Sequence, residues 1–112
     1  MQMIDAKAAP TIPNPHQVAV RKLYDSEHAQ AMHITLKPGE SLKKHMTPVD
    51  VLFYVLQGRG VVEIGDERQE VGPDTLIDSP ARIPHTWHNE SDDLVRVLVV
   101  KTPRPTETTR LL

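Results

Sequence analysis

The sequence predicts an all-β domain, a β-sandwich or a β-barrel, and three observations lead to this fold class. Short stretches rich in β-branched and apolar residues recur at a spacing of about 8–12 residues, separated by glycine, proline and polar turn residues. The chain has 10 prolines against 5 glycines, and proline interrupts helices because it lacks a backbone N–H. The longest apolar run has six residues, Val51 to Leu56, which is the length of a strand.

The predicted elements follow one another along a single domain of 112 residues, a size that holds one hydrophobic core. We expect an N-terminal arm over residues 1–16, where three prolines prevent a continuous helix or central strand. A barrel is expected over residues 17–101, and a C-terminal tail without periodicity over residues 102–112. Within the barrel, strands are expected at residues 17–23, 29–37, 50–57, 61–64, 68–71, 75–77, 82–83, 86–88 and 94–101.

Turn residues mark the ends of several of these strands. The second strand ends at the pair Pro38 and Gly39, the third ends at Gly58, and the Gly-Asp-Glu segment that begins at Gly65 makes a hairpin. If Val51 points inward, the two-residue period of a strand also turns Phe53 inward.

Composition excludes several classes of function. The chain has 13 basic and 15 acidic residues, giving a net charge of -2, and no basic cluster in the sequence suggests a nucleic-acid partner. It has no cysteine, so a metal would need histidine, carboxylate or hydroxyl ligands. No run is long enough to span a membrane and the first residues do not form an apolar signal. We therefore expect a cytoplasmic protein with no membrane partner.

Two segments resemble the two signature motifs of the cupin superfamily. The first motif has Gly, five residues, His, one residue, His, three or four residues, Glu, six residues and Gly. Here Gly39, His45 and Gly58 match, whereas Thr47 stands in place of the second histidine and Val51 in place of the glutamate.

The second motif has Gly, five residues, Pro, one residue, Gly, two residues, His, three residues and Asn. Gly72, Pro80, His85 and Asn89 match it, with extra residues before Pro80 and with Arg82 in place of the glycine. The ordered pair of motifs is far more specific than a single histidine would be. The resemblance implies a double-stranded β-helix, or jelly-roll barrel, of the small single-domain cupin type.

The resemblance also implies a divalent metal ion inside the barrel, held by three histidines and one glutamate. Only His45 and His85 carry over as metal ligands, and two histidines alone make a weak site. Thr47 is a tentative weak ligand. Asp50 is a second tentative ligand, although alternation turns it away unless a bulge intervenes. His88 is an odd number of residues from His85 and is expected to face away from it.

The barrel interior is also expected to form a largely apolar pocket with few polar groups. Phe53 and Trp87 are predicted to line or fill it, and packing is the simpler role for both. Outside the pocket, His16 lies in the arm, and His33 is expected at the surface by default.

Three functions remain open at this point. The first is a small cupin with a degenerate divalent-metal site, which would act as a metal-dependent dioxygenase or isomerase on a small molecule. The second is a metal-free barrel that binds or senses a small-molecule ligand, with the histidines as hydrogen-bonding groups. The third is an assembly module. Exposed strand edges and the two terminal arms further suggest a homodimer.

Overall fold

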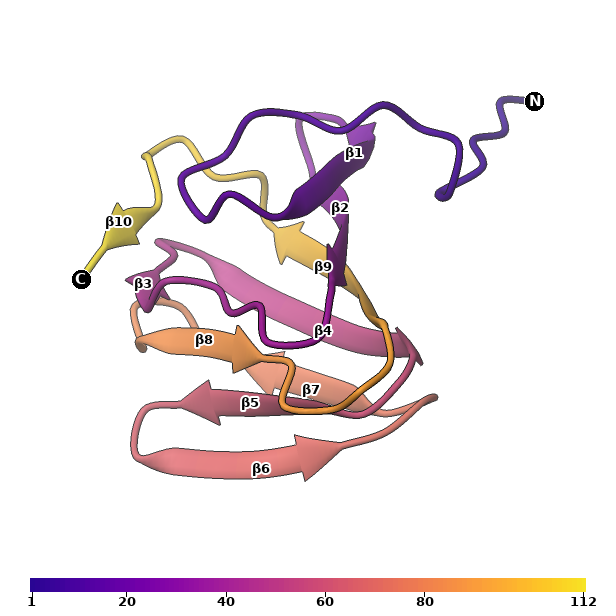
Figure 1. Ribbon diagram of the computed structural model, residues 1–112. Coiled ribbons are helices and arrows are strands. Elements are labelled where there is room, and N and C mark those ends of the chain that lie inside the picture. The colour runs from indigo at the N-terminus through magenta and orange to yellow at the C-terminus, as the bar shows by residue number, and fades with distance from the viewer.

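The computed structural model covers residues 1–112 and consists of ten strands without a helix (Figure 1). The strands are β1 (Ala19–Asp25), β2 (Gln30–Leu36), β3 (His45–Met46), β4 (Asp50–Gln57), β5 (Gly60–Ile64), β6 (Glu67–Val71), β7 (Leu76–Ser79), β8 (His85–His88), β9 (Val95–Thr102) and β10 (Arg110–Leu111).

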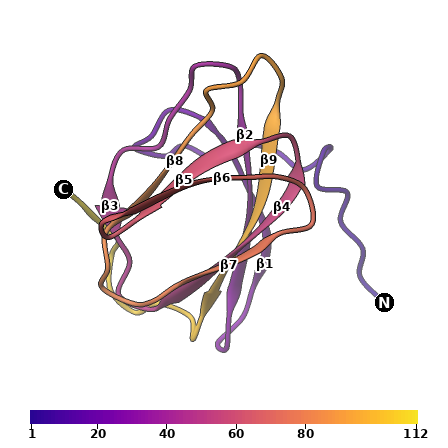
Figure 2. The same ribbon diagram turned by 90° about the horizontal axis from the view of Figure 1, so that it is seen from below.

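The strands form two five-stranded sheets that face each other around one core. One sheet has the order β1-β2-β9-β4-β7 and the other β10-β3-β8-β5-β6, and every pairing is antiparallel. Figures 1 and 2 show the chain winding around a shared interior, with the two termini on opposite sides of the molecule. The predicted all-β barrel is confirmed.

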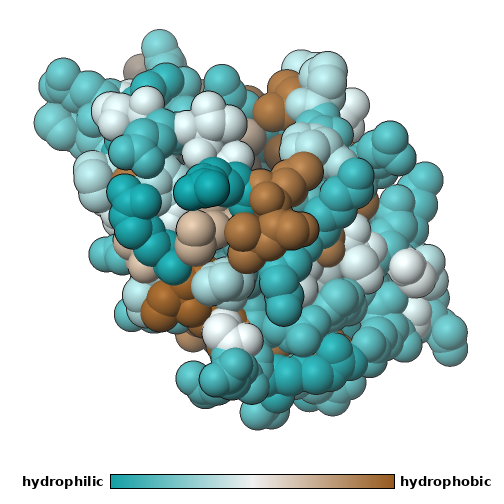
Figure 3. Space-filling model, turned by 90° about the vertical axis from the view of Figure 1, so that its left-hand side faces the viewer, coloured by the Kyte–Doolittle hydropathy of each residue, from teal (hydrophilic) through white to brown (hydrophobic).

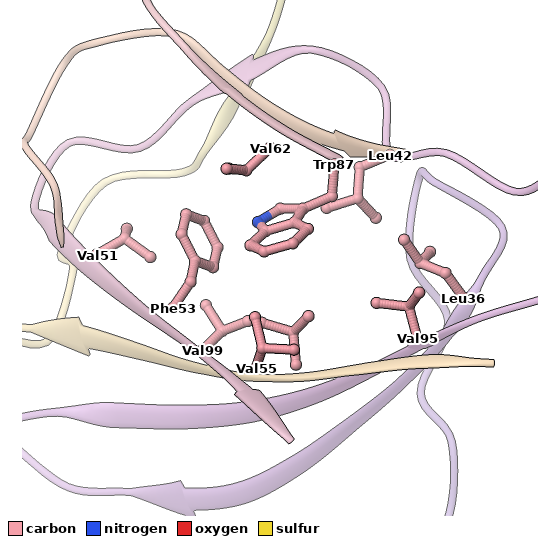
Figure 4. Close-up of a cluster of buried hydrophobic side chains, with 10 residues drawn as sticks. Leu36, Leu42, Val51, Phe53, Val55, Val62, Trp87, Val95 and Val99 are labelled. Carbon is pink, nitrogen blue, oxygen red and sulfur yellow. The ribbon is translucent and has the colours of Figure 1, made fainter. Parts of the chain in front are cut away.

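The core comes from the inward faces of β4 and β9. The two strands are in register, with Phe53 opposite Val99 and Val55 opposite Val97, so each pair points the same way. Phe53 meets Trp87 of β8 edge to face, with ring centroids 5.5 Å apart (Figure 4). The buried apolar cluster is Leu36, Leu42, Val51, Phe53, Val55, Val62, Trp87, Val95, Val97 and Val99.

The structure differs from the sequence prediction at three short segments. Residues 82–83 form a turn instead of a strand: Arg82 has a φ of 64°, and the Ile83 N–H donates to the Pro80 carbonyl. The two-residue strand β3 is not predicted, because two residues show no period. The C-terminal tail was expected to be an arm, but it returns to the barrel and pairs through β10 with β3.

The face that carries β10, β3 and the β5–β6 turn has a group of apolar side chains on an otherwise polar surface (Figure 3). Leu111 and Leu112 of the C-terminal segment are among the exposed apolar residues of the chain. No helix in this structure is long and apolar enough to cross a membrane.

A glycine substitution tests the packing of the turn after β4. Gly58 has a φ of 80°, and a Cβ there would lie 2.1 Å from the Leu94 carbonyl oxygen. Gly39 has a φ of 85° with nothing within 4 Å of its Cβ position, so it is a matched control. We expect Gly39→Ala to lower the free energy of unfolding by about 1 kcal/mol, the cost of the left-handed backbone. Gly58→Ala should cost clearly more in urea denaturation, and equal losses would contradict the backbone clash.

Candidate functional site

A cavity of about 310 Å³ opens between the two sheets, beside the N-terminal arm and the C-terminal segment. Its walls are mostly apolar, and four of its polar residues, His16, His45, Thr47 and His85, lie near one another. The apolar part includes side chains from β2, β4, β9 and β10. These are Met32, Ile34, Val51, Phe53, Val99 and Leu111.

His45 and His85 face each other inside this cavity. They form the one residue pair between β3 and β8, and their ring centroids lie 4.4 Å apart. Both side chains are buried. The His85 Nδ1 lies 2.7 Å from the Ser79 hydroxyl, and its Nε2 lies 3.4 Å from that of Thr47. The structure thus brings together three of the residues chosen from the sequence: His45, His85 and Thr47.

The hydrogen bond of His45 to the backbone fixes its tautomer. Its Nδ1 lies 2.7 Å from the Lys43 carbonyl oxygen, which can only accept. In the neutral ring the hydrogen is therefore on Nδ1, and Nε2 carries a lone pair. No protein group bonds to this Nε2. His45 consequently presents an acceptor at the cavity.

His16 is a cavity residue that sequence reasoning did not find. The Lys43 backbone N–H donates to its Nδ1 at 2.9 Å, and its ring centroid lies 4.8 Å from that of His45. Because Nδ1 accepts, the hydrogen of the neutral ring is on Nε2, which is a donor. His16 precedes β1 in a proline-containing segment without periodicity, so no signal in the sequence could have placed it here.

Lys101 is the only charged side chain that lines the cavity. It lies directly opposite Val51 in the β4–β9 ladder, and it continues the inward-facing series Val95, Val97 and Val99. Its ammonium has no hydrogen bond and no ion pair within the protein. The inward direction of Lys101 could have been predicted from the sequence, because residues two positions apart in a strand face the same side and Val99 faces inward.

Burial keeps the three imidazoles uncharged. Desolvation, with the neighbouring His45, Lys43 and Lys101, lowers the pKa of His16 to about 4. Desolvation, with the neighbouring His45, Lys101 and His16, lowers the pKa of His85 to about 3. Burial lowers the pKa of His45 against the opposing effect of its backbone hydrogen bond, and it lowers the pKa of Lys101. The cavity is therefore an apolar chamber with neutral imidazoles and one ammonium.

Three other residues considered from the sequence lie elsewhere. Asp50 is exposed, and its Oδ1 accepts the Ala81 N–H at 2.9 Å, so this tentative ligand does not reach the cavity. His88 is half-buried on the outer face of its sheet, bonded to Glu63 and to the Ser41 hydroxyl. Trp87 packs in the core behind Phe53, whereas Phe53 itself lines the cavity with its ring centroid 5.2 Å from that of His85.

Comparisons with known proteins agree with this architecture. The family described as "Cupin domain" matches residues 32–101. A solved protein of Thermus thermophilus is 33% identical, with a TM-score of 0.81 over 94% of this chain and 100% of that one. The polyketide cyclase RemF of Streptomyces resistomycificus is 22% identical, with a TM-score of 0.85 over 100% of this chain and 85% of that one.

A third relative has no function in its description, which gives only its fold. An uncharacterized protein of Methanocaldococcus jannaschii is 29% identical over 87 residues, which are 77% of this chain and 75% of that protein. Its crystal structure is described as an RmlC-like cupin with a double-stranded β-helix fold, and it gives a TM-score of 0.75 over 93% of this chain and 95% of that one. The jelly-roll fold predicted from the two motifs is confirmed.

The residues of this cavity do not fit the divalent ion that the fold family implies. No group of three histidine, cysteine, aspartate or glutamate side chains is placed to hold a metal. The position where the family motif has its glutamate is Val51, and Asp50 beside it is turned outward. The group opposite Val51 is the Lys101 ammonium, which repels a cation. The donor set therefore suits an anion better than a metal.

The low pKa of His85 predicts a loss of stability in mild acid. An unfolded chain protonates this histidine below pH about 6.5, whereas the folded chain keeps it neutral down to about 3. The unfolded state then binds more protons, so stability falls as the pH falls through this window. We expect His85 to contribute a loss of roughly 2 kcal/mol between pH 7 and pH 5.

Urea denaturation at several pH values measures this effect. His85→Gln should make the dependence of the unfolding free energy on pH shallower between 6.5 and 4, while His16, His33 and His45, whose pKa values burial also lowers, still contribute. His28→Gln changes an exposed histidine and should leave that dependence as it is. An unchanged slope in His85→Gln would contradict the buried, neutral state of this ring.

Proposed function

This chain belongs to the cupin-domain family, and on that basis we propose that its barrel binds a small molecule with an apolar body and an anionic oxygen group. The ligand is held through the Lys101 ammonium, without a metal ion. The observation that carries this proposal is the placement of Lys101 in an apolar cavity that has no carboxylate.

An unpaired ammonium in such a cavity is costly, because burial removes water without supplying a counter-charge. A ligand carboxylate or enolate oxygen would supply that charge. The apolar walls, which include Val51, Phe53 and Val99, would hold the rest of the molecule. A cavity of about 310 Å³ is at the small end of the usual range for ligand sites.

The histidines would orient the ligand. The His45 Nε2 is an acceptor and the His16 Nε2–H is a donor, so the two rings select for a ligand with both kinds of polar group. Because both rings are neutral, they add no second positive charge at pH 7.

A thermal-shift screen tests the proposal. Aromatic and branched aliphatic carboxylates are compared with their own neutral amides, and the same plate carries divalent metal salts. We expect carboxylates to raise Tm with concentration, because a ligand that binds only the folded state stabilises it by mass action. Equal effects of acids and amides, or stabilisation by metal salts alone, would contradict the proposal.

Substitution of Lys101 separates function from stability. Lys101→Met keeps the length of the side chain and removes its buried charge. We expect carboxylate binding to be lost. The unfolding free energy should rise by about 1 kcal/mol, because the substitution removes an unpaired buried charge that costs stability in the absence of ligand. Lys22→Met removes a half-exposed lysine of β1 and should leave ligand binding unchanged. Lower stability together with unchanged binding in Lys101→Met would overturn the assigned role.

The free acceptor of His45 favours a second candidate function, the enolisation of a small carbonyl compound. A neutral imidazole with its lone pair at the cavity is a suitable general base, and the Lys101 ammonium would stabilise the enolate oxygen. Solvent deuterium exchange into the α-position of diketone probes, compared between the wild type and His45→Gln, tests it. No exchange above buffer would exclude it for those probes.

We also propose that the protein is a homodimer in solution. Each sheet has two edge strands, which are β1 and β7 in one sheet and β10 and β6 in the other. Unpaired edges and the apolar side chains seen in Figure 3 gain from being covered by a second copy. Sedimentation velocity at micromolar concentration should give a dimer, and a monomer there would refute it.

A further inference from the structure

A second recess, of about 540 Å³, lies on the other side of the sheet from the barrel cavity. Strand β2 separates the two. Met32 and Ile34 point inward and line the barrel cavity, whereas the alternate residues His33 and Thr35 point outward and line the recess. The recess is thus a distinct site, and nothing in the proposed function of the barrel uses it.

The recess gathers positive charge that the protein does not neutralise. Lys7, Arg21, Lys37 and Arg96 line it, and none of them has an ion pair. The single carboxylate in the lining, that of Glu40, accepts a hydrogen bond from the Lys37 backbone N–H. Such a concentration of one sign is notable in a chain whose net charge is -2.

The other arginines show how this protein normally treats a guanidinium. Four of them pair with a carboxylate: Arg59 with Glu70, Arg68 with Glu63 and Glu90, Arg82 with Glu107, and Arg104 with Asp25. The recess arginines instead bond to neutral groups. Arg21 donates to the Ala9 carbonyl, and Arg96 donates to His33 and to Gln57. Their remaining N–H groups are left without an anionic partner.

His33 forms the floor of the recess, although its sequence position suggested the surface. Its exposure is 1%, because β2 is an inner strand of the sheet and the N-terminal segment covers this face. The Arg96 Nε–H donates to its Nε2 at 3.2 Å, so the hydrogen of the neutral ring is on Nδ1. This buried Nδ1–H has no acceptor in the protein. The recess thus brings together donors from two guanidiniums and this imidazole, beside the single carboxylate of Glu40.

We propose that this recess binds a small oxyanion, the phosphate or carboxylate group of a metabolite. The cross-strand register supports a built site. Arg21 lies directly opposite His33, and Arg96 lies directly opposite Thr35, so two guanidiniums, an imidazole and a hydroxyl come from neighbouring positions on rigid strands. Planar guanidinium groups match the geometry of phosphate and carboxylate. His33 acts as a positioning residue, since it and Gln57 hold the Arg96 side chain over the recess.

Titration of the full-length, ¹⁵N-labelled protein with inorganic phosphate tests this site, with succinate as a parallel probe and with chloride used to keep the ionic strength constant. We expect saturable shifts of the His33, Thr35 and Arg96 amide signals with at least one of the two probes. With phosphate, which has no apolar body for the barrel cavity, the signals of His45 and His85 should stay in place. Succinate shifts are assigned to the recess only where the His33, Thr35 and Arg96 signals move, because a carboxylate can also shift the barrel signals under the proposed function.

Three variants test the assignment of the recess residues. Arg96→Gln should weaken binding about tenfold or more, the usual effect of losing a hydrogen bond to a charged group. Lys7→Gln, on the exposed arm and unable to disturb the core, should weaken it several-fold. Arg59→Gln removes the same charge from a site that is ion-paired to Glu70 and should bind as the wild type does.

Three results would overturn the proposal. Shifts that do not saturate with either probe, an equal loss in Arg59→Gln, or shifts confined to the barrel residues would each show that the recess is not an oxyanion site. Saturation with succinate alone would support it and assign a carboxylate as the ligand group.

Discussion

The antiparallel register of β4 and β9 is the constraint on which the rest of the structure depends. These two strands lie side by side in the middle of their sheet, and their inward faces supply most of the buried valines. Because Phe53 faces Val99, the next inward pair must be Val51 and Lys101. A shift of one residue would expose the valines and move the ammonium to the outside. The same register therefore builds the core and places the one charge in the cavity.

The positive charge of Lys101 makes the barrel cavity less suited to a metal ion. The first sequence motif resembles the pattern of a metal-binding barrel, yet the carboxylate position is valine and the residue across from it is a lysine. Metal ligands are negative or neutral, and one carboxylate normally offsets the charge of the ion. Here the polar groups of the cavity include neutral imidazoles, a hydroxyl and an ammonium. Two of the motif's histidines are present, and the ammonium opposite the carboxylate position supports the proposal that this cavity takes an anion.

Sequence reasoning reached the fold because the patterns that predict it are periodic and local. Alternation identified β4 and the inward face shared by Val51 and Phe53, and two ordered motifs identified the barrel. His16 could not be found, because it reaches the cavity by a backbone contact with Lys43, which is distant in sequence. The burial of His33 likewise depends on the N-terminal segment that covers this face, and no alternation in the sequence predicts where that segment lies. Lys101 was within reach of sequence reasoning, since alternation continued past Val99 would have turned it inward.

The two candidate sites share one physical basis, an unpaired cation that is partly buried. A folded domain is stable by only about 5–15 kcal/mol, so an unpaired, partly buried cation uses a meaningful share of that margin. Most arginines of this chain avoid the cost by pairing with a carboxylate. Lys101 inside the barrel, and Arg21 with Arg96 on the opposite face, do not. Because β9 carries Arg96 outward and Lys101 inward, a single strand presents an unpaired cation to each chamber, and this is the common basis of the two proposals.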